Sequence, residues 1–152
     1  MQIIKDQQIV ENSWTYIPDD AKLPAERSDI TVSLKRWNEE FNNLEKYKGK
    51  VGVRINPDDS LESLNPSIMK LALIEVNFPV FTDGRSFSLA QQLRTRLKFQ
   101  GEVRAVGQFM PDQIFYLSRV GVNSFALENQ ENLANAIGMF DDFSDSYQAS
   151  VS

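Results

Sequence analysis

Residues 74–88 read IEVNFPVFTDGRSFS, and this stretch carries the strongest fold signal in the sequence. The apolar segment Leu71–Val76 predicts a buried strand that ends just before a polar loop. Ser86 stands where the N-cap of a following amphipathic helix is expected. In α/β proteins, ligands bind where the carboxyl ends of strands meet the amino ends of helices. We therefore expect a ligand site in this loop, formed by Thr82, Asp83, Gly84, Arg85 and Ser86.

Apolar strands and amphipathic helices alternate along the rest of the chain. Further strands are predicted at Val51–Ile55, Glu102–Val106 and Ser124–Leu127, and helices at Ser86–Phe99, Pro111–Val120 and Asn129–Phe140. Strands that alternate with helices favour right-handed crossovers and a parallel sheet. The prediction is an α/β fold with about four parallel strands, arranged either as an open sheet or as a half-barrel.

The amino-terminal part is expected to decorate this core. Ile3–Ile4 and Ile9–Val10 predict a short β-hairpin. The aromatic and proline residues between 14 and 24 indicate an irregular connection, and a short strand is expected at 30–32. A helix then follows, with Trp37 on its core-facing side.

The two ends of the chain differ in composition. We expect a single α/β domain over residues 1–140, followed by an acidic, flexible tail over residues 141–152. The tail interleaves aspartate with aromatic residues, so an alternative is a short segment that docks on a partner through Phe143 and Tyr147.

The composition excludes several kinds of chemistry. The 152 residues contain no cysteine and no histidine, so the chain itself supplies no disulfide, thiolate, imidazole base, haem ligand, Fe–S cluster or His/Cys-ligated metal. A net charge of −5 with scattered basic residues disfavours a nucleic-acid surface. No apolar run approaches the ~20 residues of a membrane span, and the first residues lack the apolar core of a secretory signal. We therefore expect a cytoplasmic protein.

Two interpretations of the 82–85 segment stay open. It can be a simple turn, because Asp-Gly favours turns and Arg85 can pair with Asp83. It can also be an anion or cofactor-phosphate site, in which Arg85 and the backbone N–H groups after Ser86 are the donors. A second polar loop should lie on the same rim of the sheet, with Gly107, Asp112 and Gln113.

Charged residues also occur inside apolar strands. Arg104 must pair, reach solvent or face a ligand, because an unpaired buried charge is costly. Its partner is expected to be Asp83 or Glu75. Arg54 and Glu75 are placed similarly, so a buried Arg–carboxylate network and a ligand site are equally supported. We keep Arg104 among the candidate ligand-binding residues.

Three ordered motifs resemble a bacterial family of unknown function. They are FTDGR at 81–85, RAVG at 104–107 and DQIFYL at 112–117. Members of that family are described as oxidoreductases or as accessory proteins of assimilatory sulfite reduction. The chain departs from the expected pattern at Val80 and Pro111, where basic residues are common, and at Val120, where some members have cysteine. These differences remove up to two positive charges near the predicted site.

The resemblance leaves two functions open. The first is an accessory or adaptor protein of assimilatory sulfite reduction, with sulfite reductase or another sulfur-assimilation enzyme as partner and an anion or nucleotide at the 82–86 loop. The second is a flavin- or nucleotide-binding oxidoreductase component. No Gly-x-Gly-x-x-Gly fingerprint supports the second. A half-barrel would also expose sheet edges, so we expect a homo-oligomer.

Overall fold

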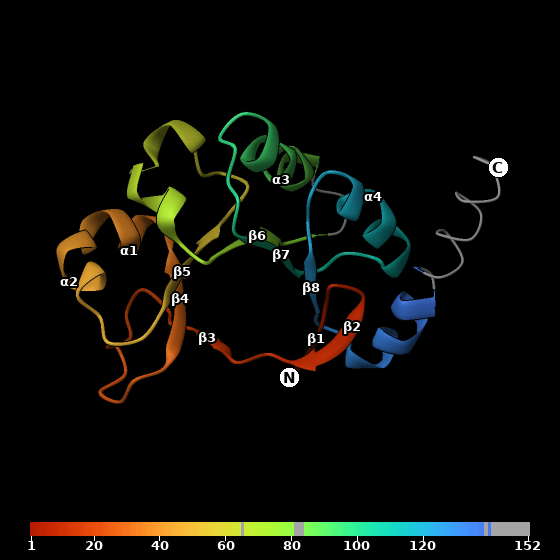
Figure 1. Ribbon diagram of the computed structural model, residues 1–152, viewed down its shortest axis with the longest axis horizontal. Coiled ribbons are helices and arrows are strands. Elements are labelled where there is room, and N and C mark those ends of the chain that lie inside the picture. Colours follow the sequence, from red (N-terminus) through yellow and green to blue (C-terminus); the bar gives the residue numbers. More distant parts are fainter. Residues whose placement is uncertain (65, 81–83, 139, 141–152) are drawn as a thin grey trace.

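A single curled, open sheet organises the chain, of which the computed structural model describes residues 1–64, 66–80, 84–138 and 140 (Figure 1). Eight strands of this described part follow the order β2-β1-β8-β7-β6-β5-β4-β3 across the sheet. They are β1 (Gln2–Lys5), β2 (Gln8–Glu11), β3 (Trp14–Tyr16), β4 (Asp29–Ser33), β5 (Val51–Ile55), β6 (Leu73–Phe78), β7 (Glu102–Gly107) and β8 (Ser124–Leu127).

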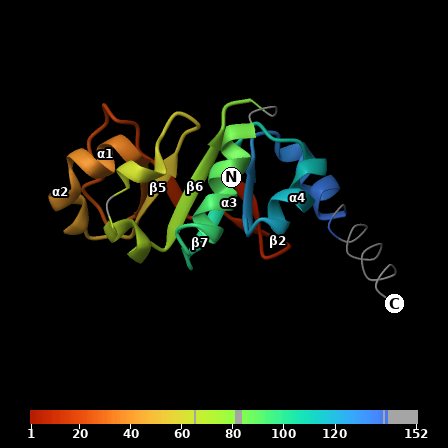
Figure 2. The ribbon, with the colours of Figure 1, turned by 90° about the horizontal axis from the view of Figure 1, so that it is seen from above.

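The helices lie along the outer, convex side of the curled sheet (Figures 1 and 2). The α-helices are α1 (Leu34–Glu39), α2 (Phe41–Glu45), α3 (Gly84–Thr95) and α4 (Ile114–Arg119). Short 3₁₀ turns are η1 (Leu61–Ser63), η2 (Pro66–Lys70), η3 (Pro111–Gln113) and η4 (Gln130–Asn132), and residues 133–138 are helical. None of the described helices is long and apolar enough to cross a membrane.

The α/β prediction is confirmed in outline, but the sheet is larger than expected. The six strands from β3 to β8 are parallel to one another, whereas about four parallel strands were predicted. Trp14–Tyr16, predicted to be irregular, forms β3 and pairs with β4. Consecutive parallel strands with helices on one side make a half-barrel, which decides between the two arrangements that the pattern had left open.

The predicted hairpin forms and joins the same sheet. β1 and β2 pair antiparallel around the two-residue turn Asp6-Gln7, whose φ angles are 50° and 66°. Positive φ at both turn residues matches the right-handed twist of the two strands. β1 also pairs antiparallel with β8, so the hairpin extends the parallel sheet beyond its last strand.

One extended segment links the two edges of the open sheet. β2 lies at one edge and β3 at the other, yet only two residues separate them in the chain. Asn12 is one of these residues, and its backbone N–H donates to the Met1 carbonyl at 2.9 Å. The segment from Gln8 to Tyr16 therefore pairs with β1 through β2 and with β4 through β3. It spans the opening of the half-barrel.

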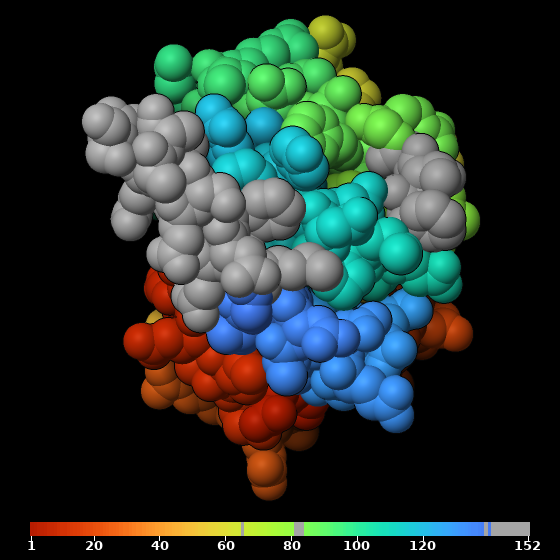
Figure 3. Space-filling view, turned by 90° about the vertical axis from the view of Figure 1, so that its right-hand side faces the viewer, coloured from red at the N-terminus to blue at the C-terminus, as the bar shows by residue number. Residues whose placement is uncertain are grey.

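The first and last described segments pack together. The N–H of Gln2 donates to the side-chain oxygen of Gln130 at 2.9 Å. Figure 3 shows the surface of the amino-terminal hairpin, in red, against the blue surface of the residues that follow β8. This packing places the amino-terminal hairpin beside the last described turn.

The two faces of the sheet are chemically different. The face toward the helices is apolar, and its side chains form the main core with residues such as Ile74, Val103 and Phe125. Successive residues of a strand point to opposite sides of the sheet, so every second side chain lies on the inner face. It carries a small cluster of Ile3, Val106 and Ala126, together with a row of charged residues. The buried polar and charged side chains of the sheet therefore lie on its inner face.

Candidate functional site

The predicted loop site lies at the carboxyl edge of the sheet, where β6 passes into α3. Gly84 and Arg85 are exposed residues of the first turn of α3. Thr82 and Asp83 lie outside the described residues. Ser86 was expected to be the N-cap, but α3 already includes Gly84, so Ser86 lies inside the helix. Its buried hydroxyl donates to the Asn77 carbonyl at 2.8 Å, which fixes the helix to the end of β6.

Arg85 forms an ion pair across the edge. Its Nη1 lies 2.7 Å from Oδ1 of Asp58, in the loop after β5. Both side chains are well exposed, at 62% and 89% of their area, so this pair contributes at most about 1 kcal/mol. Arg85, Gly84 and Pro57 line a shallow depression of about 350 Å³. An anion that offers two oxygens can compete with Asp58 for the guanidinium.

A second depression lies at the ends of β7 and β8. It has a volume of about 220 Å³ and includes Gly107, Gln108, Phe109 and Asn129 in its lining. Gly107 has φ +100°, and a Cβ there would lie 2.5 Å from the Phe78 carbonyl oxygen. Only glycine fits this close passage beside β6. The predicted second polar loop therefore forms part of the edge, in a depression separate from that of Arg85.

The two residues predicted from the second loop have different surroundings. Asp112 is exposed in the first turn of η3. The side-chain oxygen of Gln113 accepts from the Met110 N–H at 2.7 Å, which caps this turn. Gln113 thus has a local structural role, and neither residue lines the two edge depressions described above.

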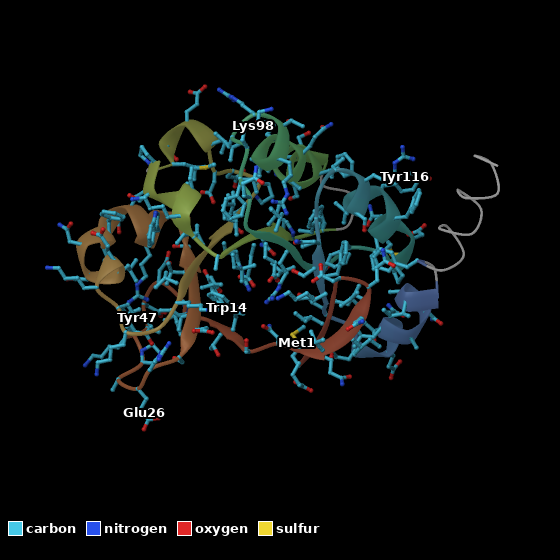
Figure 4. All side chains as sticks on the ribbon, viewed as in Figure 1. Met1, Trp14, Glu26, Tyr47, Lys98 and Tyr116 are labelled. Atoms are coloured by element: carbon cyan, nitrogen blue, oxygen red, sulfur yellow. The ribbon has the colours of Figure 1, made fainter. Side chains whose placement is uncertain are left out.

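A row of charged side chains crosses the inner face of the sheet. Arg54, Glu75, Arg104 and Ser124 occupy matched positions on β5, β6, β7 and β8. In Figure 4, side chains that carry nitrogen and oxygen fill the space inside the arc, with Trp14 at its lower side. Residues at matched positions on adjacent strands point to the same face, so these charged and polar side chains lie side by side.

Arg54 and Glu75 form the first half of this row. Nε of Arg54 donates to Oε1 of Glu75 at 3.0 Å, and the Glu75 side chain is only 3% exposed. The guanidinium stacks over Tyr16, with its Cζ 4.0 Å from the ring centroid. Burial raises the pKa of the Tyr16 phenol, although the charge of Arg54 opposes this shift. The predicted Arg–carboxylate network is thus present, and β3 supplies the ring that covers it.

Arg104 forms the second half, and its acidic partner is Glu102 rather than Glu75. Its Nη2 donates to Oε2 of Glu102 at 2.7 Å, and its Nε donates to Oγ of Ser124 at 3.1 Å. Nη1 donates to the side-chain oxygen of Asn12 at 2.9 Å. All three guanidinium nitrogens therefore have partners in this 2%-exposed side chain. Because Asp83 lies outside the described residues, that expected partner stays a prediction.

The carboxylate of Glu102 faces several donors besides Arg104. The Ser124 hydroxyl donates to it at 2.7 Å, and Nζ of Lys5 lies 3.2 Å from its second oxygen. Burial alone would raise the pKa of Glu102, but the hydrogen bond from Ser124 and the charge of Arg104 lower it overall. Glu102 is therefore held as a carboxylate. Its position two residues before Arg104, on the same face of the predicted strand, is a local signal that the prediction overlooked. Lys5 of the hairpin and Asn12 after it gave no such signal.

A third feature lies at the opposite, amino edge of the sheet. Aromatic and apolar side chains line an open groove of about 350 Å³ between α1–α2 and the segment before β6. Trp37, predicted to be core, is 4% exposed and packs edge-on against Phe41, with ring centroids 5.2 Å apart. Both residues also line the groove. The sequence gave no indication of a groove at this edge.

These positions place part of the candidate site at the carboxyl edge of the sheet, around the start of α3. The structure places Gly84, Arg85 and Ser86 together there, with Gly107 in the neighbouring depression. Arg104 lies on the inner face, bonded to Glu102. The described residues contain no group of three or more acidic residues placed to hold a metal ion.

The fold and the edge define a half-barrel α/β protein with polar loops at the carboxyl ends of its parallel strands. The chain belongs to a family described as "Bacterial protein of unknown function (DUF934)", which matches residues 52–152. The matched region begins within β5 and includes the carboxyl-edge residues from Pro57 onward. No curated protein and no solved structure matches the chain.

Proposed function

We propose that this chain is a non-catalytic accessory or adaptor protein associated with assimilatory sulfite reduction. In this proposal it binds an anion at residues 82–86 and a sulfur-assimilation enzyme through its surface. The observation that carries the proposal is the exposed Arg85–Asp58 pair at the start of α3. The association with sulfite reduction is supported by the resemblance of the FTDGR, RAVG and DQIFYL motifs to that family.

The pairing of the interior charges favours binding over chemistry. Arg54 is bonded to Glu75, and Arg104 to Glu102, inside the sheet. A buried pair that loses one partner costs about 3–5 kcal/mol, so these groups are held in place by the fold. By contrast, the Arg85–Asp58 pair, which an anion would displace, is exposed. The carboxyl edge can therefore exchange partners while the interior stays intact.

The start of α3 adds to the attraction for an anion. A helix carries partial positive charge and unbonded N–H groups at its amino end. Arg85 supplies a planar fork of donors beside this end. Sulfite, sulfate and phosphate all offer the oxygen geometry that such a fork binds. The proposed ligand class is therefore a small tetrahedral or pyramidal oxyanion, or the phosphate of a larger molecule.

The binding half of the proposal is tested by thermal shift with sulfite, sulfate and phosphate. We expect the oxyanions to raise the melting temperature of the wild-type protein and to leave that of Arg85→Ala unchanged. Arg27→Ala, which removes an exposed arginine elsewhere, should retain the full shift. Equal shifts in Arg85→Ala and the wild type would overturn the assignment of the anion to this edge.

The adaptor half is tested by size-exclusion chromatography with assimilatory sulfite reductase. Co-elution of the two proteins, with no small molecule bound in native mass spectrometry, supports the accessory role. Separate elution of the two proteins at micromolar concentration contradicts it. The two halves fail independently, because one measures an anion and the other a protein complex.

A second candidate is a flavin- or nucleotide-binding component of sulfur assimilation. The depression at Gly107, with Phe109 and Asn129 in its lining, favours it. Its volume of about 220 Å³ falls below the roughly 300–1,000 Å³ of typical ligand pockets, so it suits a phosphate or a ring rather than a whole dinucleotide. A flavin or nucleotide mass on protein purified from its own host would favour this function.

A further inference from the structure

The groove at the amino edge of the sheet combines aromatic walls with positive charge. Its apolar lining comes from α1, α2, the start of β5 and the segment before β6. The lining residues of this kind include Trp37, Phe41, Leu44, Tyr47, Val51 and Leu71. Two lysines, Lys50 and Lys70, line it as well, and both are exposed. An open groove with these walls suits an extended segment that carries aromatic side chains and negative charge.

The charge around the groove differs from that of the whole chain. Lys46 and Lys48 are also exposed and lie in the same stretch of chain as Lys50. Glu45 also lines the groove, and the Asp29 carboxylate accepts from the Lys50 backbone N–H at 3.2 Å. The lining itself thus carries two lysines and one glutamate, a local excess of positive charge in a chain with a net charge of −5. The groove therefore attracts acidic partners, including other copies of this chain.

Trp37, in the wall of the groove, also carries a buried polar group. Its indole Nε1–H is buried and has no acceptor among the described residues. A buried donor without a partner costs about 1–3 kcal/mol.

The sequence contains a segment of matching chemistry. Residues 141–152 read DDFSDSYQASVS, with three aspartates, two aromatic residues and no lysine or arginine. In Figure 1 the last described helical residues lie at the right-hand end of the molecule, and α1 and α2 lie at the left-hand end. In Figure 4, Tyr47 of the groove and Tyr116 likewise lie at opposite ends. To reach the groove of its own chain, the segment would have to run along the length of the molecule, whereas a second copy can present it directly.

We propose that the amino-edge groove binds the acidic, aromatic segment 141–152 of a second copy of this chain. The aromatic residues of the segment, Phe143 and Tyr147, pack against the groove walls. Its aspartates face Lys50 and Lys70. Because the groove and the segment are different surfaces, this contact is heterologous and produces closed rings or open chains of subunits. It gives the predicted homo-oligomer a specific interface.

The first experiment compares assembly states by light scattering after size-exclusion chromatography. The wild-type protein is expected to form oligomers that a deletion of residues 141–152 converts to monomers. The double variant Lys50→Glu, Lys70→Glu should also be monomeric. Lys35→Glu makes the same kind of charge change on α1 at the other edge of the sheet, and it should retain the oligomer. Oligomers that survive the deletion, or a wild-type chain that is monomeric, would overturn the proposal.

A binding experiment separates a lost contact from a misfolded variant. A synthetic peptide of residues 141–152 is titrated into the deletion protein, in which Trp14→Phe leaves Trp37 as the fluorophore. We expect saturable quenching or a spectral shift, with about tenfold weaker binding for a peptide in which the three aspartates are asparagine. Salt should weaken the binding, since exposed charges are screened. Equal affinity for both peptides, or no response of Trp37, contradicts the proposed occupant.

Discussion

Replacing Arg104 by methionine tests the view that the inner row of charges is structural. The side chain is 2% exposed and donates to Glu102, Ser124 and Asn12. Its removal leaves the largely buried carboxylate of Glu102 without its guanidinium partner, and the loss of one partner of a buried pair costs about 3–5 kcal/mol. Lys5 and Ser124 still face Glu102, so we expect a loss near the lower limit, about 3 kcal/mol.

Urea unfolding monitored by circular dichroism measures this loss. With a slope of about 2 kcal/mol per molar urea, the midpoint should fall by about 1.5 M. The matched control is Arg96→Met, because Arg96 is 58% exposed and pairs with Glu62 at 3.6 Å. An exposed pair of this kind should change the stability by less than about 1 kcal/mol. Equal, small effects of both substitutions would refute the structural role of the inner row.

The loss should depend on pH in a defined direction. The pKa of Glu102 is lowered in the folded protein, so its contribution to stability is present above the unfolded pKa and is lost as the pH falls through the folded one. In Arg104→Met, protonation of Glu102 relieves the uncompensated charge. The stability difference between the wild type and Arg104→Met should therefore shrink as the pH is lowered from neutrality into the acidic range. A difference that grows in acid would contradict this linkage.

Three further results are expected. Ser86→Ala removes the buried hydroxyl bond to Asn77 and should cost about 1–2 kcal/mol in urea unfolding, whereas Ser88→Ala, at an exposed position of α3, should be nearly neutral. Gly107→Ala should cost about 1–3 kcal/mol because of its positive φ and the nearby carbonyl, whereas Gly84→Ala meets open space in a helix and should be neutral or stabilising. Tyr16 should ionise above the usual pKa of tyrosine, because burial raises its pKa. The difference between the alkaline absorbance titrations of the wild type and Tyr16→Phe isolates this ionisation. Ionisation at or below the usual pKa would contradict the burial of Tyr16.

Local patterns predicted the strands and helices of the second half of the chain because each has a clear period. Leu71–Val76 was expected as a strand, and the structure has β6 at Leu73–Phe78. Helices and strands were identified, and only their ends differ by a few residues. β3 was missed because three residues with Pro18 close behind carry too little pattern, and the strand exists only through its pairing with β4. The curling of the sheet also depends on pairings between strands, and the periodic pattern within a single strand does not indicate them.

The candidate site was predicted in part for a similar reason. The position of Arg85 at the edge follows from its place after a strand, which the sequence displays. Arg104 was recognised as a charge that needs a partner, but Glu102, two residues before it on the same face of β7, was overlooked. Asn12 reaches Arg104 from the segment between β2 and β3, 92 positions away. Long-range contacts of this kind leave no mark within a single stretch of sequence.

The most direct test of the oxyanion site is a titration of the isotope-labelled protein with sulfite, followed by backbone amide NMR. We predict that the amide signals of Gly84–Ser88 shift in a saturable way, and that Arg85→Ala abolishes these shifts while the rest of the spectrum is retained. Shifts confined to the lysines of the amino-edge groove, or no saturable shifts at the start of α3, would contradict an oxyanion site at the carboxyl edge.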